Sequence, residues 1–104
     1  MSDEKPKLMN MVVIAGRNQK EAILSAMSEK GCHVINVLYG KGCADADFVM
    51  DALGLVHEEN KILITCLILN NKAEVILDML VSEFEFNKPN TGVAYTIPVE
   101  KLLY

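Results

Sequence analysis

The chain has 104 residues, which is enough for one domain (1–104) and too few for a catalytic domain with a separate regulatory one. Hydrophobic residues make up 51% and charged residues 23%, so the composition excludes a disordered chain, because it offers enough apolar surface to offset the entropy of ordering. Lys and Arg number 10 against 14 Asp and Glu, and the resulting net charge of −4 disfavours nucleic acid as a partner.

The first half of the chain predicts a strand, a helix and a second strand. Residues 8–16 (LMNMVVIAG) are apolar and rich in β-branched side chains, which is typical of a buried strand. Asn18 and the glutamate three residues later have the spacing of a capping box, which predicts a helix over about 19–30 that ends at Gly31. The segment HVINVLYG at 33–40 predicts the second strand.

Residues 43–60 form a connection longer than an ordinary turn. Its middle, DADFVMDALG at 45–54, has the composition of a short helix. The carboxylates of Asp45, Asp47 and Asp51 lack the spacing of a calcium loop, so capping and solvation of this helix explain them better than bound Mg²⁺ or Ca²⁺. No metal site is predicted.

The second half of the chain repeats the strand-helix order. KILITCLIL at 61–69 is continuously apolar and predicts a strand, and Asn71 begins a second capping spacing. One apolar stripe predicts a helix that faces a sheet and ends near Phe86; its residues are Ala73, Ile76, Leu77, Leu80 and Phe84. The last strand is predicted at 92–99, with Pro98 at a sheet edge or beyond the ladder.

The order βαββαβ is that of the ferredoxin-like fold, an α+β architecture in which two helices cover one face of a four-stranded antiparallel sheet. The predicted strands at 33–40 and 61–69 carry apolar side chains at both odd and even positions. Both faces of the sheet are therefore apolar, including the face without helices. An apolar face of this size usually marks an interface, and a second copy of the chain is the simplest partner. We therefore expect a homo-oligomer.

The compartment is indicated by weak signals. The strongly apolar segments, 11–16 and 62–69, are well short of the roughly 18 to 20 residues that cross a bilayer, and the N-terminal residues offer no cleavage signal. The cysteines are odd in number and lack CxxC spacing, as is typical of reduced thiols; they are Cys32, Cys43 and Cys66. We expect a cytoplasmic protein.

From Lys61 onward, the segment KILITCLILNNKAEVILDMLVSEFEFNKPNTGVAYTIPVEKL resembles, without a gap, the third strand, second helix and fourth strand of the nitrogen-regulatory PII and PII-like signalling proteins. Lys41 and Gly42 resemble the pair that opens the family's effector loop, the T-loop. The resemblance implies a homotrimer that binds AMP, ADP or ATP as effector in the clefts between subunits. The residues implied to bind it are Lys41, Gly42, Lys61, Asn90, Thr91 and Gly92.

Departures from the family pattern indicate a divergent member. The phosphate-binding turn Gly-Asp-Gly-Lys is replaced by Asn90-Thr91-Gly92-Val93, and Tyr104 stands where the family has the first of two arginines. The loop at 43–60 is a shortened T-loop and contains no tyrosine for uridylylation. With fewer cations for a triphosphate, AMP or ADP is expected to rival ATP.

The residues themselves leave two interpretations open at each implied position. Lys61 either binds phosphate or is a solvated lysine at the end of an apolar strand, where its charge disfavours aggregation. Gly40-Lys41-Gly42 brings backbone N–H groups to an anion or serves as a hinge. The turn at 90–92 binds a ligand or is an ordinary loop.

The function implied by the resemblance is that of a regulator that senses a small metabolite and controls a partner protein, a membrane transporter or a metabolic enzyme, through loop 43–60. The alternative is an ACT-like amino-acid sensor, which has the same element order and is usually a dimer. An enzyme is not expected and no catalytic residue is predicted, because neither histidine has the context of a triad. Arg17, at the first strand-helix turn, lacks the glycine-rich anion cradle of the acylphosphatases, which share the fold.

Overall fold

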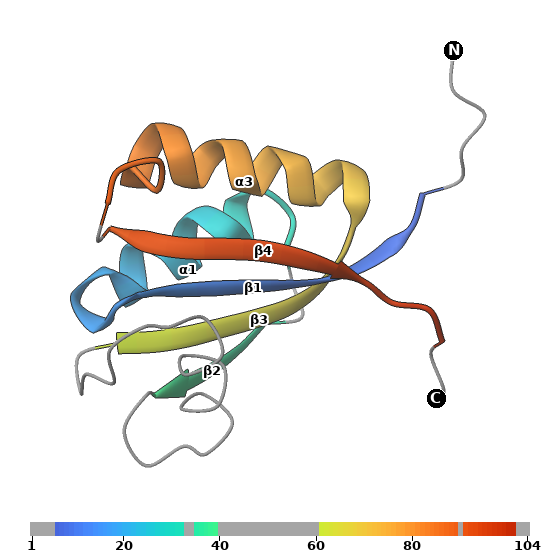
Figure 1. Ribbon diagram of the computed structural model, residues 1–104, viewed down its shortest axis with the longest axis horizontal. Helices are drawn as coiled ribbons and strands as arrows, with labels where there is room; N and C mark the ends of the chain where they lie inside the picture. The colour runs from blue at the N-terminus through green and yellow to red at the C-terminus, as the bar shows by residue number, and fades with distance from the viewer. Residues whose placement is uncertain (1–5, 33–34, 40–60, 90, 102–104) are drawn as a thin grey trace.

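The computed structural model describes residues 6–32, 35–39, 61–89 and 91–101, and within this part of the chain two helices cover one face of a four-stranded sheet (Figure 1). The strand order is β2-β3-β1-β4, and every neighbouring pair is antiparallel. The strands are β1 (Leu8–Gly16), β2 (Ile35–Tyr39), β3 (Lys61–Leu69) and β4 (Gly92–Pro98). The helical elements are the 3-10 turn η1 (Arg17–Gln19), α1 (Lys20–Glu29) and α3 (Asn70–Phe84). The predicted ferredoxin-like α+β fold is confirmed.

The strands agree closely with the apolar runs in the sequence. β1 and β3 have the predicted bounds, and β2 lies inside its predicted range. Among the described strands, β4 pairs with β1 alone and is therefore an edge strand. Because an edge strand has a neighbour on one side only, β4 can end in Pro98, which has no backbone N–H to donate.

Both predicted capping boxes are wrong. Asn18 lies inside η1, and the cap residues of η1 and α1, Gly16 and Gln19, make no side-chain cap hydrogen bond. α3 begins at Asn70, one residue before the predicted cap, and Leu69 in its N-cap position makes no side-chain cap hydrogen bond either. The reason is that each strand passes directly into its helix, which leaves no linker residue to serve as a cap.

Asn70 instead ties the first turn of α3 to the start of β1. Its backbone N–H donates to the carbonyl oxygen of Lys7 at 2.8 Å, and its Oδ1 accepts from the backbone N–H of Lys7 at 3.2 Å. This reciprocal pair fixes the angle at which the chain leaves β3.

The two helices end in left-handed residues of different type. Gly31, with φ +92°, follows α1 as predicted, and glycine adopts this conformation without steric cost. α3 ends at Phe84, earlier than predicted, because Glu85 takes φ 59° and the N–H of Phe86 returns to the carbonyl oxygen of Leu80 at 3.1 Å. A glutamate therefore occupies a position that favours glycine.

The main core lies between the sheet and the two helices. Alternate residues of β1 and β3 point into it, and each is at most 5% exposed: Met11, Val13, Ala15, Ile62, Ile64, Cys66 and Ile68. The helices contribute Ile23, Met27, Ala73, Ile76, Met79 and Leu80. The inward-facing side chains, which are every second residue of each strand, thus pack against the apolar stripes of the helices.

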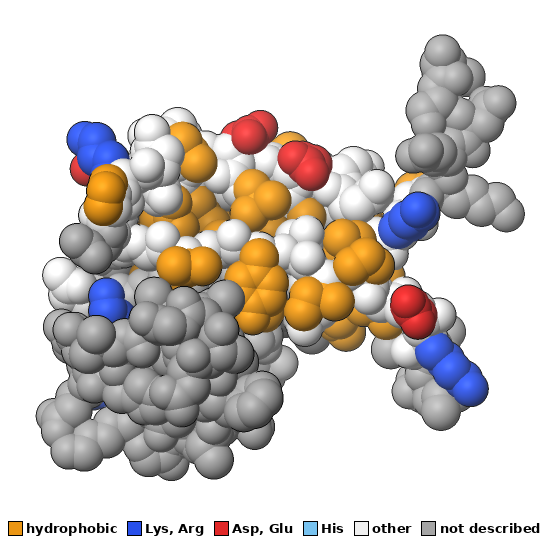
Figure 2. Space-filling model, viewed as in Figure 1, with side chains coloured by type: hydrophobic (Ala, Val, Ile, Leu, Met, Phe, Trp, Pro, Cys, Tyr) orange, Lys and Arg blue, Asp and Glu red, His pale blue; other side chains and the backbone are white. Residues whose placement is uncertain are grey.

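The opposite face of the sheet, called the open face below, is also apolar, as predicted. Strand register places these side chains in cross-strand rows. One cluster is formed by Val12, Ile14 and Leu63 with Leu38, Val93 and Tyr95. Further along the same face, Leu67, Leu69 and Ile97 are 37%, 39% and 48% exposed. Figure 2 shows hydrophobic side chains in a band along the strands, below α3.

Candidate functional site

One end of the sheet, called the Lys61 end below, gathers three of the residues implied to bind an effector. In the strand register Lys61 pairs with Gly16, and Gly92 pairs with Ala15. Because β3 and β4 flank β1, these two residues lie two strand spacings apart, about 10 Å. Thr91 directly precedes β4 and lies at the same end.

The other three implied residues, Lys41, Gly42 and Asn90, lie outside the described part of the chain, as does the whole loop 43–60. The short helix predicted at 45–54 lies there as well. These remain predictions from the sequence.

Gly92 has a packing role that the sequence did not indicate. A Cβ at this position would meet the ring of Phe86, with Cε2 at 2.7 Å and Cε1 at 2.8 Å, well inside the contact distance of two carbons. The Phe86 ring in turn packs against the main core. Glycine is therefore needed here for packing, whether or not a ligand binds.

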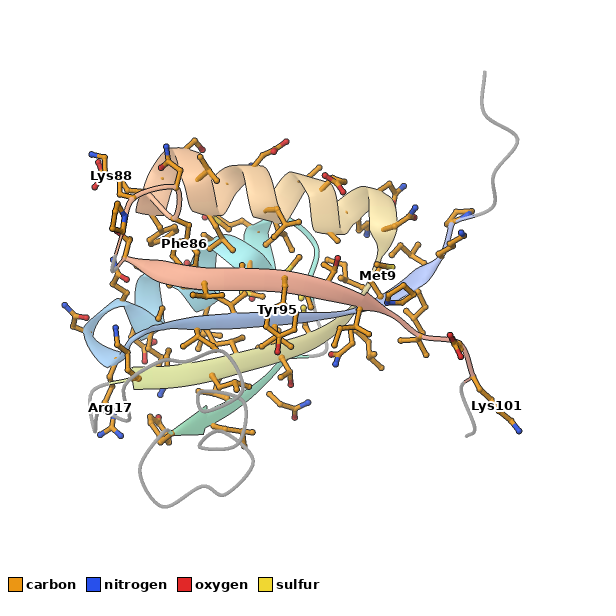
Figure 3. All side chains as sticks on the ribbon, viewed as in Figure 1. Met9, Arg17, Phe86, Lys88, Tyr95 and Lys101 are labelled. Carbon is orange, nitrogen blue, oxygen red and sulfur yellow. The ribbon has the colours of Figure 1, made fainter. Side chains whose placement is uncertain are left out.

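A second group at the same end of the sheet comprises Arg17, Lys20 and Tyr39. The guanidinium carbon of Arg17 lies 4.5 Å from the centroid of the Tyr39 ring, in cation-π geometry. Lys20 Nζ lies 5.4 Å from the same centroid and donates a hydrogen bond of 2.8 Å to the Tyr39 hydroxyl. We call these three residues the Arg17–Lys20–Tyr39 cluster. Figure 3 shows Arg17 at this end of the sheet, away from Tyr95 in its middle.

The hydrogen bond to Tyr39 raises the pKa of Lys20, so the ammonium group is cationic at neutral pH. Glu21 Oε1 lies 3.8 Å from Lys20 Nζ, but the Glu21 side chain is 90% exposed and the pair is screened by water. The cluster therefore has a surplus of positive charge.

Sequence reasoning missed this cluster as a binding site. It considered Arg17 only as part of an acylphosphatase cradle, and Tyr39 only as a strand residue. The available signal was the spacing of Arg17 and Lys20, since residues three apart lie on one side of a helical turn. Tyr39 reaches them only through the pairing of β2 with β3.

Cys32 and Cys66 are free thiols, 1% and 2% exposed, and both belong to the main core. The hydrogen bond that Cys66 donates to Cys32 raises the pKa of Cys66, with burial adding to it, and lowers the pKa of Cys32. Both thiols are closed to solvent, so they are packing residues in this structure.

Within the described ranges no three His, Cys, Asp or Glu side chains come together as metal ligands. The described helices include none that is both long and apolar enough to cross a membrane.

Comparison by sequence finds no relatives: no family model matches the chain, and no curated protein matches it. Comparison of structures gives a clear result. The apo form of CPII from Thiomonas intermedia K12, a nitrogen regulatory PII-like protein, superposes with a TM-score of 0.65 at 15% identity, over 91% of this chain and 90% of CPII.

Further solved structures agree. CPII bound to ADP, AMP and acetate gives a TM-score of 0.61 at 18% identity, over 94% of each chain. A candidate PII-like signalling protein from Thermus thermophilus gives 0.63 at 16% identity, over 92% of this chain and 90% of that one. The chain has the fold of the PII-like signalling proteins. The PII-like resemblance predicted from residues 61–102 is thereby confirmed at the level of fold.

Proposed function

We propose that the protein is a divergent PII-like signalling protein that binds an adenine nucleotide and is not an enzyme. The observation that carries this proposal is the PII-like fold over more than nine tenths of the chain, shared with CPII structures that hold ADP and AMP. CPII has also been solved with ADP and bicarbonate, which makes a small oxyanion a second candidate effector. The element order alone would fit an ACT-like sensor equally well.

The proposed nucleotide site lies at the Lys61 end of the sheet, between subunits of a homotrimer. Lys61 supplies a cation for the phosphates, and the residues around Thr91 and Gly92 supply backbone N–H groups. Lys41, Gly42 and Asn90 complete the set by the family resemblance. The apolar open face supports the assembly, because the helices leave Leu67, Leu69 and Ile97 uncovered.

Signalling follows if the nucleotide binds one conformation of loop 43–60 better than another, because only differential affinity shifts a population. The loop then controls a partner protein in the cytoplasm, a membrane transporter or a metabolic enzyme. A role in nitrogen regulation is part of the same proposal.

The experiment is calorimetric titration of the purified protein with AMP, ADP, ATP and cyclic AMP. We expect binding of at least one nucleotide, with AMP or ADP rivalling ATP. Lys61→Ala should weaken binding about tenfold if its ammonium group contacts phosphate. The control is Lys101→Ala, which removes the same charge beyond the end of β4 and is expected to change affinity by less than about twofold.

Two outcomes would contradict the proposal. Absence of binding by every adenine nucleotide would reject the nucleotide, and binding of amino acids by a dimer would favour the ACT-like alternative. Equal losses in Lys61→Ala and Lys101→Ala would show that Lys61 acts only through net charge.

A further inference from the structure

We propose that Arg17, Lys20 and Tyr39 form an oxyanion site that takes the diphosphate group of a nucleotide, on the helix-covered side of the sheet end that carries Lys61. The assignment of a nucleotide rests on the proposed function above. The oxyanion site itself rests on the geometry of the Arg17–Lys20–Tyr39 cluster and can be tested without a nucleotide.

The cluster presents more hydrogen-bond donors than acceptors. Lys20 Nζ donates to the Tyr39 hydroxyl oxygen at 2.8 Å, so the hydroxyl hydrogen of Tyr39 is left to donate to another group. The Arg17 guanidinium is stacked on the Tyr39 ring at 4.5 Å, which leaves its N–H groups at the edge of the stack. Phosphate oxygens are acceptors only, and they are the complement of such a group.

The two positive charges of the cluster are only weakly balanced by carboxylates of the described residues. Arg17 and Lys20 are held against one aromatic ring, and the hydrogen bond to Tyr39 favours the charged form of Lys20 more than repulsion from Arg17 opposes it. Both lie in the first residues of η1 and α1, where a cation also opposes the helix dipole. Among the described residues, the carboxylate paired with the cluster is that of Glu21, at 3.8 Å and highly exposed. A bound phosphate would remove this repulsion.

The strand register places the cluster at the same end of the sheet as Lys61 but on the other side. Arg17 directly follows Gly16, which pairs with Lys61, and Tyr39 pairs with Ile62. Ile62 points into the main core, so Tyr39 lies on the helix-covered side, where it contacts Lys20 of α1. Lys61 has the parity of Leu63 on the open face, so the cluster is an anion site separate from Lys61.

The test is titration with inorganic pyrophosphate and, separately, with ADP, using the full chain. The variants are Arg17→Gln, Lys20→Gln and Tyr39→Phe, and the control is Lys30→Gln, at the other end of α1. We expect pyrophosphate affinity to fall about tenfold in the first two variants, about threefold in Tyr39→Phe, and less than about twofold in the control.

Thermal unfolding without ligand separates binding from structure. Arg17→Gln and Lys20→Gln should lower the midpoint by no more than about 5 °C, because each removes only an exposed contact with the Tyr39 side chain. A fall in pyrophosphate affinity that merely follows a larger fall in the midpoint would overturn the proposal, since it would show a structural role. Absence of pyrophosphate binding at millimolar concentration, or equal losses in Lys30→Gln, would overturn it too.

The ADP arm tests the nucleotide assignment by itself. Parallel losses for ADP and pyrophosphate would support the full proposal. Losses for pyrophosphate, with ADP binding absent or unaffected by the variants, would keep the oxyanion site and reject the nucleotide as its ligand. Failure of this proposal is thus distinguishable from failure of the proposed function.

Discussion

The two faces of the sheet use the same strands but differ in what covers them. On the helix-covered face Met11, Val13 and Ala15 of β1 are each 0% exposed. On the open face Val12 and Ile14 of the same strand are 5% and 3% exposed, whereas residues further along that face are a third to a half exposed. A strand that is apolar at both parities requires cover on both sides. The difference shows that part of the open face lacks cover within one subunit, and this is the part that we propose as an interface.

The largest effect is expected from a charge on the open face, which should cause loss of the proposed assembly. Ile97→Lys puts a charge on the open face and should dissociate the proposed homotrimer, because an unpaired lysine buried at each interface carries a large desolvation penalty. That penalty opposes the burial of about 800 Å² per partner, which is worth roughly 20 kcal/mol before association costs. Val75→Lys is the matched control, since Val75 is 47% exposed on α3 and Ile97 is 48% exposed. Light scattering measures both. A wild-type monomer at micromolar concentration would contradict the interface.

The second-largest effect is expected on the helix-covered face, which is fully buried within one subunit. Ile64→Ala should lower the free energy of unfolding by about 2–5 kcal/mol, because it opens a cavity between sheet and helices. Leu67→Ala, on the open face and 37% exposed, should cost the isolated subunit less than about 1.5 kcal/mol. Both are best measured by urea unfolding in the Ile97→Lys background, where subunit concentration has no influence. Equal losses of unfolding free energy in Ile64→Ala and Leu67→Ala would mean that the two faces are equally packed within one subunit.

The two faces also explain which features could be predicted from the sequence. β1 and β3 were placed correctly because continuous apolar runs determine them locally. Gly31 was placed correctly because its left-handed φ is a local requirement of the helix end. The capping boxes at Asn18 and Asn71 failed because the direct passage of strand into helix, a tertiary feature, overrode a spacing of residue types.

The candidate site was predictable only where one segment carries it. Lys61 was found as the first residue of an apolar strand. The Arg17–Lys20–Tyr39 cluster was missed because Tyr39 comes from a different strand, and no spacing in the sequence indicates that it reaches Lys20. Gly92 was interpreted as a ligand contact from the family resemblance, and that stays a prediction. Its packing role was missed because the ring of Phe86 that excludes a side chain comes from another segment.

A smaller effect tests the packing role of Gly92. Gly92→Ala should cost about 1–3 kcal/mol, because the added carbon meets the Phe86 ring. In a Phe86→Leu background the same substitution should cost less, and a double-mutant cycle of urea unfolding measures the difference. The same loss in both backgrounds would contradict the clash. If Gly92 also contacts nucleotide, the double variant should recover stability without recovering affinity for ADP.

The smallest expected effect is a gain in stability at the end of α3. Glu85 has φ 59°, and a left-handed conformation costs a residue with a Cβ about 1–2 kcal/mol. Glu85→Gly removes that cost but also the ion pair with Lys88 at 2.9 Å, whose side chains are 62% and 60% exposed and which is worth at most about 1 kcal/mol. The net result should be a gain of about 0.5–1 kcal/mol in urea unfolding.

Glu83→Gly is the matched control, because Glu83 is an exposed glutamate two residues earlier and inside α3. Glycine there should lower stability by about 1 kcal/mol through loss of helix propensity. Opposite signs for the same change at neighbouring positions would isolate the backbone conformation of Glu85 as the cause. A loss in both variants would show that the contact between Glu85 and Lys88 outweighs the strain.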